Sequence, residues 1–492
     1  MGYNKTIQNC HPNERTVPMS LSLRQISSDD KIVQQTLLHV FEHLYPVSLL
    51  SQILDQTHGW EQRERETNMV QMCYLIMALH LFPRLSQRGV LRELASGLRW
   101  IWPEKPDKPF EITVTSAIST RRKHLPVLVL RRLFEQVCHP IATPATKGAF
   151  ALGLRLMAID GTLDNVIETQ ANATHFGRAS TLHKGATPFP QVRCAYLSEC
   201  GTHCIVAARM GPCHHSEEAL AIGLVSSITA KMLVMMDSGL FSLWWAKQVQ
   251  DRQSHLLARI TSTMFLHPDQ ILSDGSYLVH TRLPSRGMTQ GEVLTLRVIE
   301  YQIADPILGQ SHKIHRLVTT VLDPLLAPAM ELIQIYHERW EIESSLDEQK
   351  NQLRLASRPL RGLTPQLVSQ ELYGLLLTHF ALRSLMHDAA VQADLDPDRL
   401  SFTHAVEVVS RAVRDFTQWS QQDHPFLKAR LLEDLCDDLL PAQRRVRFQA
   451  RAVKRSKARY DSKRRFFFSY TPDHIHSFTD LIVPEHRLLL LN

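Results

Sequence analysis

The stretch LRLMAIDGT, Leu154–Thr162, decides the fold of this chain. A short apolar run that leads into Asp-Gly-Thr is typical of a buried strand that meets a turn. The stretch KMLVMMDSG, Lys231–Gly239, repeats this pattern. The first run ends at Asp160 and the second at Asp237. Since the ligand sites of α/β sheets gather at the carboxyl ends of strands, both aspartates are candidate site residues.

A predicted hairpin and a helix separate these two strands. Strands are predicted at 192–199 and 202–208, and Ser216 followed by two glutamates predicts the start of a helix over 216–228. The order strand, hairpin, helix, strand predicts a mixed α/β core. A β-rich insertion is expected at about 255–325, where four strand-like runs lie between turns: 255–260, 277–282, 293–300 and 317–322.

Apolar residues at helical spacing dominate both ends of the chain. This spacing runs from Lys31 to about Cys138, and returns over 327–354 and 371–389. The first 28 residues are polar, and we expect them to be loosely ordered. The sequence therefore predicts helical regions on both sides of the α/β core.

The composition favours a large soluble protein. The chain has 492 residues, 44% of them hydrophobic and 21% charged, which is enough for several domains with their own cores. Its least polar stretch, Met69–Pro83, is shorter than the roughly 20 residues of a membrane crossing, so we expect a buried helix there. The polar N-terminus lacks the apolar segment of a signal peptide. We therefore expect a cytoplasmic protein with no membrane partner.

Several cysteines and histidines raise the alternative of a zinc site: Cys194, Cys200, Cys204, Cys213, His214 and His215. Structural zinc sites usually draw on closely spaced pairs of ligands, and no C-x-x-C pair occurs in this group. The strand pattern around the group offers another explanation. We expect these cysteines to be small core residues of the hairpin.

Positive charge is concentrated near the C-terminus. Between Arg444 and Arg465 there are eleven Lys or Arg and one acid, so this segment carries +10, while the whole chain carries +6 and the remainder −4. A basic run of this density suits the phosphate backbone of a nucleic acid, and a solvated tail is the alternative. The candidate contacts are Arg444, Arg445, Arg447, Lys454 and Arg455.

The predicted helix over 327–354 carries a stripe of functional groups. At about 100° per residue, a tyrosine, three cations and a carboxylate share a sector roughly 60° wide: Tyr336, Arg339, Lys350, Arg354 and Glu343. Such a stripe is suited to holding a phosphodiester beside a metal-binding carboxylate, whereas the alternative is an ordinary charged helix face. Asp347 lies on the same face, so helical geometry leaves Glu343 and Asp347 as equal alternatives for the carboxylate.

The spacing Tyr336-(2)-Arg339-(3)-Glu343-(6)-Lys350 resembles the Y-(2)-R-(3)-E-(6)-K signature of the insertion-sequence-four family of DDE transposases. One position departs from the family, because Ser238 follows the second aspartate where Arg is common. Other segments resemble the family in the same order, within roughly residues 30–390: Asp160-Gly161-Thr162, Asn172, Phe176-Gly177-Arg178, Leu233–Phe241, Asp274–Leu278, Thr319–Asp323 and Gln370–Tyr373.

The resemblance implies a fold and a chemistry. The fold would be a ribonuclease H-like catalytic core interrupted by the β-rich insertion, with helical N-terminal and C-terminal domains. Asp160, Asp237 and Glu343 would be the catalytic residues. They would bind two Mg²⁺ ions, with Asp160 shared between them and Mn²⁺ a plausible substitute.

The resemblance also implies partners. A cut-and-paste transposase would act on terminal inverted repeats and on target DNA, as a homodimer on paired ends. Tyr336, Arg339 and Lys350, with Arg354 and the basic tail, would contact DNA. The alternatives are a hydrolytic nuclease on the same fold and an inactive repressor that binds the ends. The predicted domains are a flexible N-terminus (1–28), an end-binding helical domain (29–145), the catalytic domain (146–390) and a helical, basic C-terminal region (391–492).

Overall fold

The computed structural model describes residues 38–61, 69–101, 115–181, 185–261, 264, 266–283, 292–302, 304–305, 309–310, 314–355 and 358–441. The predicted flexible N-terminus and the whole basic segment lie outside these residues, and so do Arg444, Arg445, Arg447, Lys454 and Arg455. Within the described part of the chain, no helix is long and apolar enough to cross a membrane.

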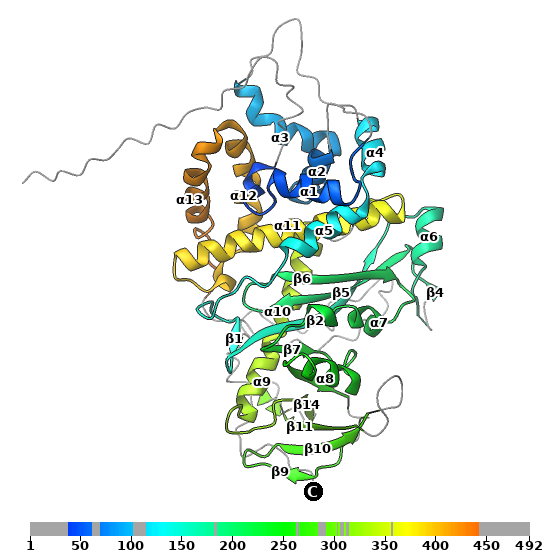
Figure 1. Cartoon of the computed structure of the whole chain (residues 1–492), viewed down its shortest axis with the longest axis vertical. Coiled ribbons are helices and arrows are strands. Elements are labelled where there is room, and N and C mark those ends of the chain that lie inside the picture. The colour runs from blue at the N-terminus through cyan, green and yellow to red at the C-terminus, as the bar shows by residue number, and fades with distance from the viewer. Residues whose placement is uncertain are drawn as a thin grey trace, which may run out of the picture.

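A ten-stranded sheet forms the centre of the molecule (Figure 1). Its strands are ordered β6-β5-β2-β7-β8-β14-β11-β10-β9, and β1 pairs with β2 beside this path. The strands are β1 Phe150–Ala151, β2 Leu154–Asn165, β5 Gln191–Glu199, β6 Ile205–Pro212, β7 Met232–Met236, β8 His255–Ile260, β9 Gln270–Ile271, β10 Tyr277–Arg282, β11 Val293–Tyr301 and β14 His315–Thr319. Two separate two-stranded sheets pair β3 Ser180–Thr181 with β4 Gly185–Ala186, and β12 Ala304–Asp305 with β13 Gly309–Gln310.

The large sheet has a parallel centre with antiparallel strands on both sides. β2 pairs in parallel with β7, and β7 pairs in parallel with β8. The remaining pairs are antiparallel. The prediction of a mixed α/β core is therefore confirmed. Because β14 pairs with β8, the strands of the expected insertion extend the same sheet.

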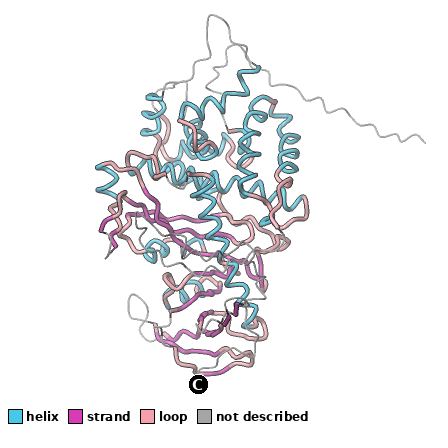
Figure 2. The backbone as a smooth tube through the Cα atoms, turned by 180° about the vertical axis from the view of Figure 1, so that it is seen from behind, coloured by secondary structure: helices cyan, strands magenta, loops and turns pink. Residues whose placement is uncertain are grey.

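Helices cover both faces of the sheet. Two of them, α7 (Glu217–Ile222) and α8 (Leu243–Gln250), pack on the face where Met157 and Ile159 of β2 point. On the other face, Leu156 and Ala158 of β2 pack against α9 (Ala329–Glu338), and the core includes a residue of α10 (Trp340–Asp347). Figure 2 shows this second helical segment crossing in front of the strands.

The N-terminal and C-terminal helices form one layer beyond the β6 edge (Figure 1). The 28-residue helix α11 lies along this edge, and every residue of α2 is buried among the helices around it, which confirms the helix expected at Met69–Pro83. The helices are α1 Val47–Gln56, α2 Met69–Leu81, α3 Gln87–Ile101, α4 Thr115–His124, α5 Val127–Val137, α11 Pro365–Gln392, α12 Phe402–Gln418 and α13 His424–Asp434, with α6 (Gln170–Phe176) after β2.

Among the predicted boundaries that are wrong, two lie at the site. The single helix expected over 327–354 consists of α9, α10 and a π-helical turn, η4 (Glu348–Gln352). The wider π turn shifts the helical phase, so that Glu348 faces α11 while Lys350 still reaches β2. The strand expected to end at Asp160 continues to Asn165, because β5 pairs with this whole extension.

Candidate active site

The two predicted aspartates lie side by side on adjacent parallel strands. Ile159 and Met236 form the last parallel pair of β2 and β7, and Asp160 and Asp237 directly follow them along the chain. Each carboxylate accepts a hydrogen bond from the backbone N–H that follows it, at 2.8 Å for Asp160 and 2.7 Å for Asp237. The local backbone thus fixes both carboxylates at the carboxyl end of the parallel pairing.

The guanidinium of Arg339 connects β2 to the segment that carries the Tyr336–Lys350 signature. Arg339 lies between α9 and α10 and is only 8% exposed. Its Nη2 donates to Oε1 of Glu343 at 3.1 Å, and its Nη1 lies 3.5 Å from Oδ2 of Asp160. Asp160 and Glu343 therefore contact the same guanidinium. The negative charge of Asp237 also helps to raise the pKa of Arg339.

The structure separates the two carboxylates that helical geometry left equal. Asp347 is exposed and accepts a hydrogen bond from the side chain of Asn351, one turn further on. Glu343 is half-buried and contacts Arg339. Of the two, Glu343 is the side chain placed beside the guanidinium that reaches Asp160.

The remaining cations of the stripe contact alternate residues of β2. Residues Asp160, Thr162 and Asp164 point to one face of the strand, since side chains alternate along it. The Nζ of Lys350 donates to Oγ1 of Thr162, and Nη1 of Arg354 lies 2.9 Å from Oδ1 of Asp164. The side chain of Arg354 is only 12% exposed, so its guanidinium is engaged within the protein. The partners Thr162 and Asp164 could have been found only by extending β2 past Asp160.

Tyr336 lies in the core and not on a free surface. It is 6% exposed, and its hydroxyl lies 3.5 Å from the carbonyl oxygen of Met236, the residue before Asp237. The guanidinium carbon of Arg339 lies 5.8 Å from the centre of its ring. Burial raises the pKa of Tyr336 to about 12, so the hydroxyl is neutral at physiological pH. The ring of Tyr336 therefore packs against the guanidinium of Arg339.

Two family models match the chain in order along its length. The model for the insertion element 4 transposase N-terminal region matches residues 35–135, and the model for the transposase DDE domain matches residues 152–380. A similar protein is transposase InsG for insertion sequence element IS4 of Escherichia coli (strain K12). It is 26% identical over 372 residues, which are 74% of this chain and 80% of that protein.

The chain belongs to the insertion-element-4 family of DDE transposases. The family expected from the signature is therefore confirmed, and the protein is an enzyme that cleaves DNA and transfers strands. Among solved structures, the cryo-EM structure of the piggyBac transposase synaptic complex with hairpin DNA has a TM-score of 0.43 and 12% identity, over 82% of this chain and 86% of that chain.

Charge is unevenly balanced at the carboxylates of this transposase. Burial raises the pKa of Asp160, and the neighbouring Asp237 raises it further, although Arg339 opposes both. Burial also disfavours the charge of Arg339, but Tyr336 and the carboxylates around it hold its pKa above the ordinary value. A further cation at this site would therefore relieve repulsion that Arg339 and Lys350 leave in place.

A fourth carboxylate of the transposase lies beside this group and was missed from the sequence. A Cβ atom added to Gly161 would lie 2.5 Å from Cγ, Cδ and Oε1 of Glu217, the first residue of α7. Burial raises the pKa of Glu217, and the charge of Asp160 adds to the shift, while Arg193 at 3.6 Å opposes it. In the sequence, Glu217 is an ordinary acid of a helix start, and nothing local marks its contact with β2.

A buried ion cluster holds the π-helical turn of the transposase against α11. The carboxylate of Glu348 contacts Nη2 of Arg383, and its Oε2 lies 3.0 Å from Nε of the same residue. Nε2 of His379 lies 2.9 Å from this carboxylate, and Nδ1 of His203 lies 3.4 Å away. Burial disfavours the charge of Glu348, but these neighbours hold its pKa well below the usual value. Since Lys350 follows two residues later, the cluster also positions the signature lysine.

The cysteines of the hairpin are core residues, as expected. Cys194, Cys200, Cys204 and Cys213 are buried free thiols. Burial raises the pKa of Cys194 to about 12, which disfavours the thiolate that a zinc ion needs. Within the described residues, neither group of side chains that could hold a metal ion contains a cysteine.

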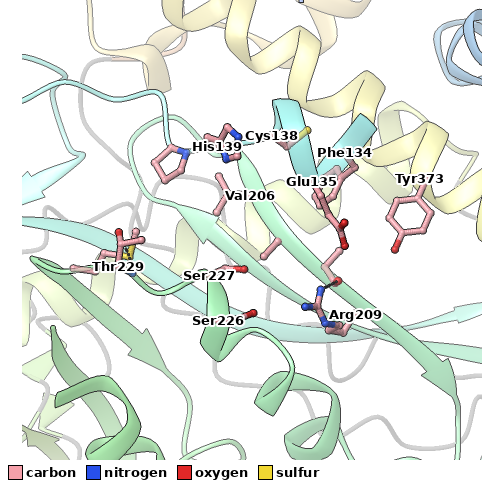
Figure 3. A pocket seen from close by; sticks show the side chains of 14 residues that line it. Phe134, Glu135, Cys138, His139, Val206, Arg209, Ser226, Ser227, Thr229 and Tyr373 are labelled. Carbon is pink, nitrogen blue, oxygen red and sulfur yellow. Dashed lines mark hydrogen bonds between the residues drawn. The ribbon is translucent and has the colours of Figure 1, made fainter. Parts of the chain in front are cut away.

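A cavity of about 370 Å³ lies away from the carboxylates, between β6, α5 and α11 (Figure 3). Glu135, Arg209 and Tyr373 line one end of it, and Ser227 and Thr229 the other. The aspartates and Glu343 are not among its lining residues. The cavity is therefore separate from the group of carboxylates around Arg339.

Proposed function

We propose that this transposase moves its element by metal-dependent cut-and-paste, with Asp160, Asp237 and Glu343 as the metal-binding carboxylates. One observation carries the assignment: a single guanidinium, that of Arg339, contacts Asp160 and Glu343, and Asp160 follows the last residue paired with the strand of Asp237. Two carboxylates from separate elements thus contact one buried cation, and the third follows the strand that pairs with β2.

The donor set fits a hard divalent cation. All three side chains offer carboxylate oxygens, and no imidazole or thiol belongs to the set, which suits Mg²⁺ and also Mn²⁺. Bound divalent cations would activate a water or a 3′-hydroxyl and stabilise the leaving oxygen of an in-line displacement. We propose two Mg²⁺ ions as the resident cofactors.

The cations of the stripe have separate roles in this proposal. Arg339 keeps Asp160 and Glu343 close together and offers a planar donor to a phosphate. Lys350 brings an ammonium to Thr162, next to Asp160 along the same face of β2. Tyr336 packs beneath Arg339 and orients it. Arg354 is held by Asp164, so we propose that it supports the stripe and contacts DNA only at its edge.

We infer a ribonuclease H-like catalytic core from the strand order β6-β5-β2-β7-β8. The first three strands pair antiparallel and the last two join in parallel, which gives an antiparallel hairpin followed by parallel crossovers. On this assignment β8 belongs to the core, so the insertion begins after Ile260 and not at 255. The predicted domains at 29–145 and 391–492 would then pack on the edge that α11 covers.

DNA is the partner that this chemistry requires, and we propose the following division of contacts. The helical N-terminal domain binds the terminal inverted repeats, and the signature stripe faces the reacting phosphates. The basic segment 444–465 contacts DNA backbone, and a homodimer holds paired ends next to target DNA. A protein with these substrates works in the bacterial cytoplasm.

The decisive assay offers the purified protein Mg²⁺, labelled inverted-repeat ends and a target plasmid. Joined products are expected from the wild type and should disappear in the Asp160→Ala, Asp237→Ala and Glu343→Ala proteins, each with wild-type circular dichroism. Asp347→Ala is the matched control, because it removes a carboxylate of the same helix that lies away from Arg339. Cleavage without joining would instead indicate a nuclease, and binding without cleavage a repressor.

Lys350→Ala tests the stripe in the same assay. We expect weaker end binding and slower joining with the fold retained, because the ammonium beside Thr162 is lost. Wild-type joining by this variant would rule out the role assigned to the lysine.

A further inference from the structure

Arginine side chains gather where the end of β2 meets the helical layer. Four residues form this arginine site: Arg122 from α4, and Arg354, Arg358 and Arg361 from the segment between η4 and α11. Burial lowers the pKa of His80, at the end of α2, to about 3, and the charges of Arg361 and Arg354 add to this shift. The signature segment and two N-terminal helices therefore meet in a positively charged environment.

Backbone hydrogen bonds fix the arginine site to the end of β2. The N–H of Leu360 donates to the carbonyl of Asn165 at 2.8 Å, and the N–H of Ile167 donates to the carbonyl of Leu360 at 2.9 Å. This short parallel bridge places Arg361 directly beyond the strand that carries Asp160. From Asp160 to Asn165 the strand extends about 16 Å, at about 3.3 Å per residue.

The cations of the signature stripe lead from Asp160 to the arginine site. Lys350 contacts Thr162. Arg354 contacts Asp164, the next residue on the same face of β2. Phosphates follow one another about every 3.4 Å along the axis for each strand of B-DNA. A duplex that lies along β2 would therefore present its backbone to the arginine site about five base pairs from a phosphate at Asp160.

Positive charge is only partly compensated at the arginine site. Glu371 is the one acid among the described residues that line a small cavity there, whereas three arginines line it. The carboxylate of Glu371 holds the backbone, since its Oε2 accepts from the N–H groups of Arg361 and Gly362 at 2.8 and 2.9 Å. Its Oε1 lies 3.8 Å from Nε of Arg361. Burial raises the pKa of Glu371, although the neighbouring arginines oppose this shift.

Arg122 is buried at this site with part of its guanidinium unpartnered. It is 8% exposed, and its Nε and Nη2 have no hydrogen-bond partner among the described residues. The side chain of Gln370 donates to the carbonyl oxygens of Arg122 and Leu125 at 2.7 and 2.6 Å, which holds the end of α4 beside α11 (Figure 1). Burial lowers the pKa of Arg122; the charge of Glu371 opposes this shift, and Arg361 adds to it. A buried charge of this kind costs stability unless a partner or a ligand compensates it.

We propose that the arginine site binds a phosphate of the DNA backbone, away from the reacting phosphate. Planar guanidiniums bind phosphate oxygens through paired N–H donors, and Arg358 and Arg361 are exposed. The cavity beside them has a volume of about 20 Å³, which is room for a single oxygen atom. His80 lines this cavity, and its Nε2 has no hydrogen-bond partner in the described part of the chain. One phosphate oxygen would enter the cavity, and the others would stay with the exposed arginines.

A phosphate held at the arginine site would connect the N-terminal helices to the catalytic sheet. Its partners would come from α4 and from the segment that pairs with the end of β2. The site depends on DNA being the partner, as proposed above, and not on the roles of the three carboxylates. It would therefore contribute to DNA binding in a protein that cannot cleave.

DNA binding at several salt concentrations tests the arginine site. Fluorescence anisotropy with a labelled inverted-repeat duplex is measured in the full-length Asp160→Ala protein without Mg²⁺, so that cleavage does not interfere. Adding Arg358→Gln and Arg361→Gln together should weaken binding by about 10-fold or more near roughly 100 mM salt, and reduce the salt slope by about 1. Arg414→Gln is the matched control, because this exposed arginine of α12 is already paired with Glu93 at 2.8 Å.

Arg122→Met separates a DNA-binding role from a structural one. Because part of the buried guanidinium is unpartnered among the described residues, this variant should melt at the same temperature as the wild type or higher. It should nevertheless bind the duplex more weakly, since the charge at the site is reduced. A lower melting temperature together with unchanged DNA binding would overturn the part of Arg122 in the site.

Neutral methylphosphonates in the duplex distinguish a DNA phosphate from a free anion. Placed about five base pairs from the cleaved end, they should weaken binding to the parent protein but have little further effect on the Arg358→Gln/Arg361→Gln variant. An unchanged salt slope in that variant, or equal losses in both proteins, would overturn the assignment. Failure of the carboxylate assignment would appear separately, as strand joining by the Asp160→Ala protein.

Discussion

Replacing Arg383 by methionine should destabilise the transposase more than any exposed charge change. Arg383 is 3% exposed and contacts both oxygens of Glu348, which is 9% exposed. Methionine keeps much of the apolar volume of the arginine stem, so the main loss is the charge. Removing one partner of a buried ion pair costs about 3–5 kcal/mol. Because His379 and His203 still face the carboxylate, we expect the lower part of this range.

Chemical unfolding followed by circular dichroism measures this loss. Arg414→Met is the control, since Arg414 forms an ion pair with Glu93 at 2.8 Å but its side chain is 56% exposed. Such a surface pair is worth about 1 kcal/mol or less. The double change Arg383→Met/Glu348→Leu should recover most of the stability, because it removes the orphaned charge together with its partner.

The deficit should also depend on pH. In the wild type the pKa of Glu348 is held well below its usual value, so its stabilising effect is present above the unfolded pKa of about 4.3 and is lost as pH falls through the folded pKa. In Arg383→Met, burial should raise this pKa, so the charged carboxylate costs stability above about pH 4.3. The gap between the two proteins should therefore be largest near pH 8 and shrink toward pH 5. A gap that is small at pH 8, or no recovery in the double variant, would refute this account of the cluster.

Three other changes separate neighbouring groups. Asp347→Asn should leave strand joining unchanged while Glu343→Gln abolishes it, since Glu343 contacts the buried guanidinium and Asp347 is exposed; equal losses would reverse that choice. Gly161→Ala puts a methyl group 2.5 Å from Glu217 and should slow joining by about 10- to 100-fold, with partial recovery when Glu217→Ala is added; absence of recovery would argue against this clash. Deleting 444–465 should flatten the salt dependence of DNA binding, measured by fluorescence anisotropy over roughly 50–200 mM salt, whereas an unchanged slope would indicate a solvated tail.

Features with local causes were predictable from the sequence. Apolar runs that end in a polar turn identified β2 and β7, and the aspartates that follow their parallel pairing. This was possible because the pattern that marks a strand depends only on neighbouring residues. The spacing from Tyr336 to Lys350 indicated the family for the same reason, and the match to the DDE domain confirmed it. Full burial of Met69–Leu81 also followed from composition alone.

Contacts between distant elements required the tertiary structure. A helical wheel could not choose between Glu343 and Asp347, because the choice depends on where Arg339 meets β2 across the sheet. The wheel also assumed one helical period. In the structure the helical phase changes at the π turn, where Glu348 contacts Arg383 of α11. The approach of α7 to Gly161 depends on the pairing of strands far apart in sequence. Local periodicity records which face of an element is apolar, but only packing decides which charged side chains that face will meet.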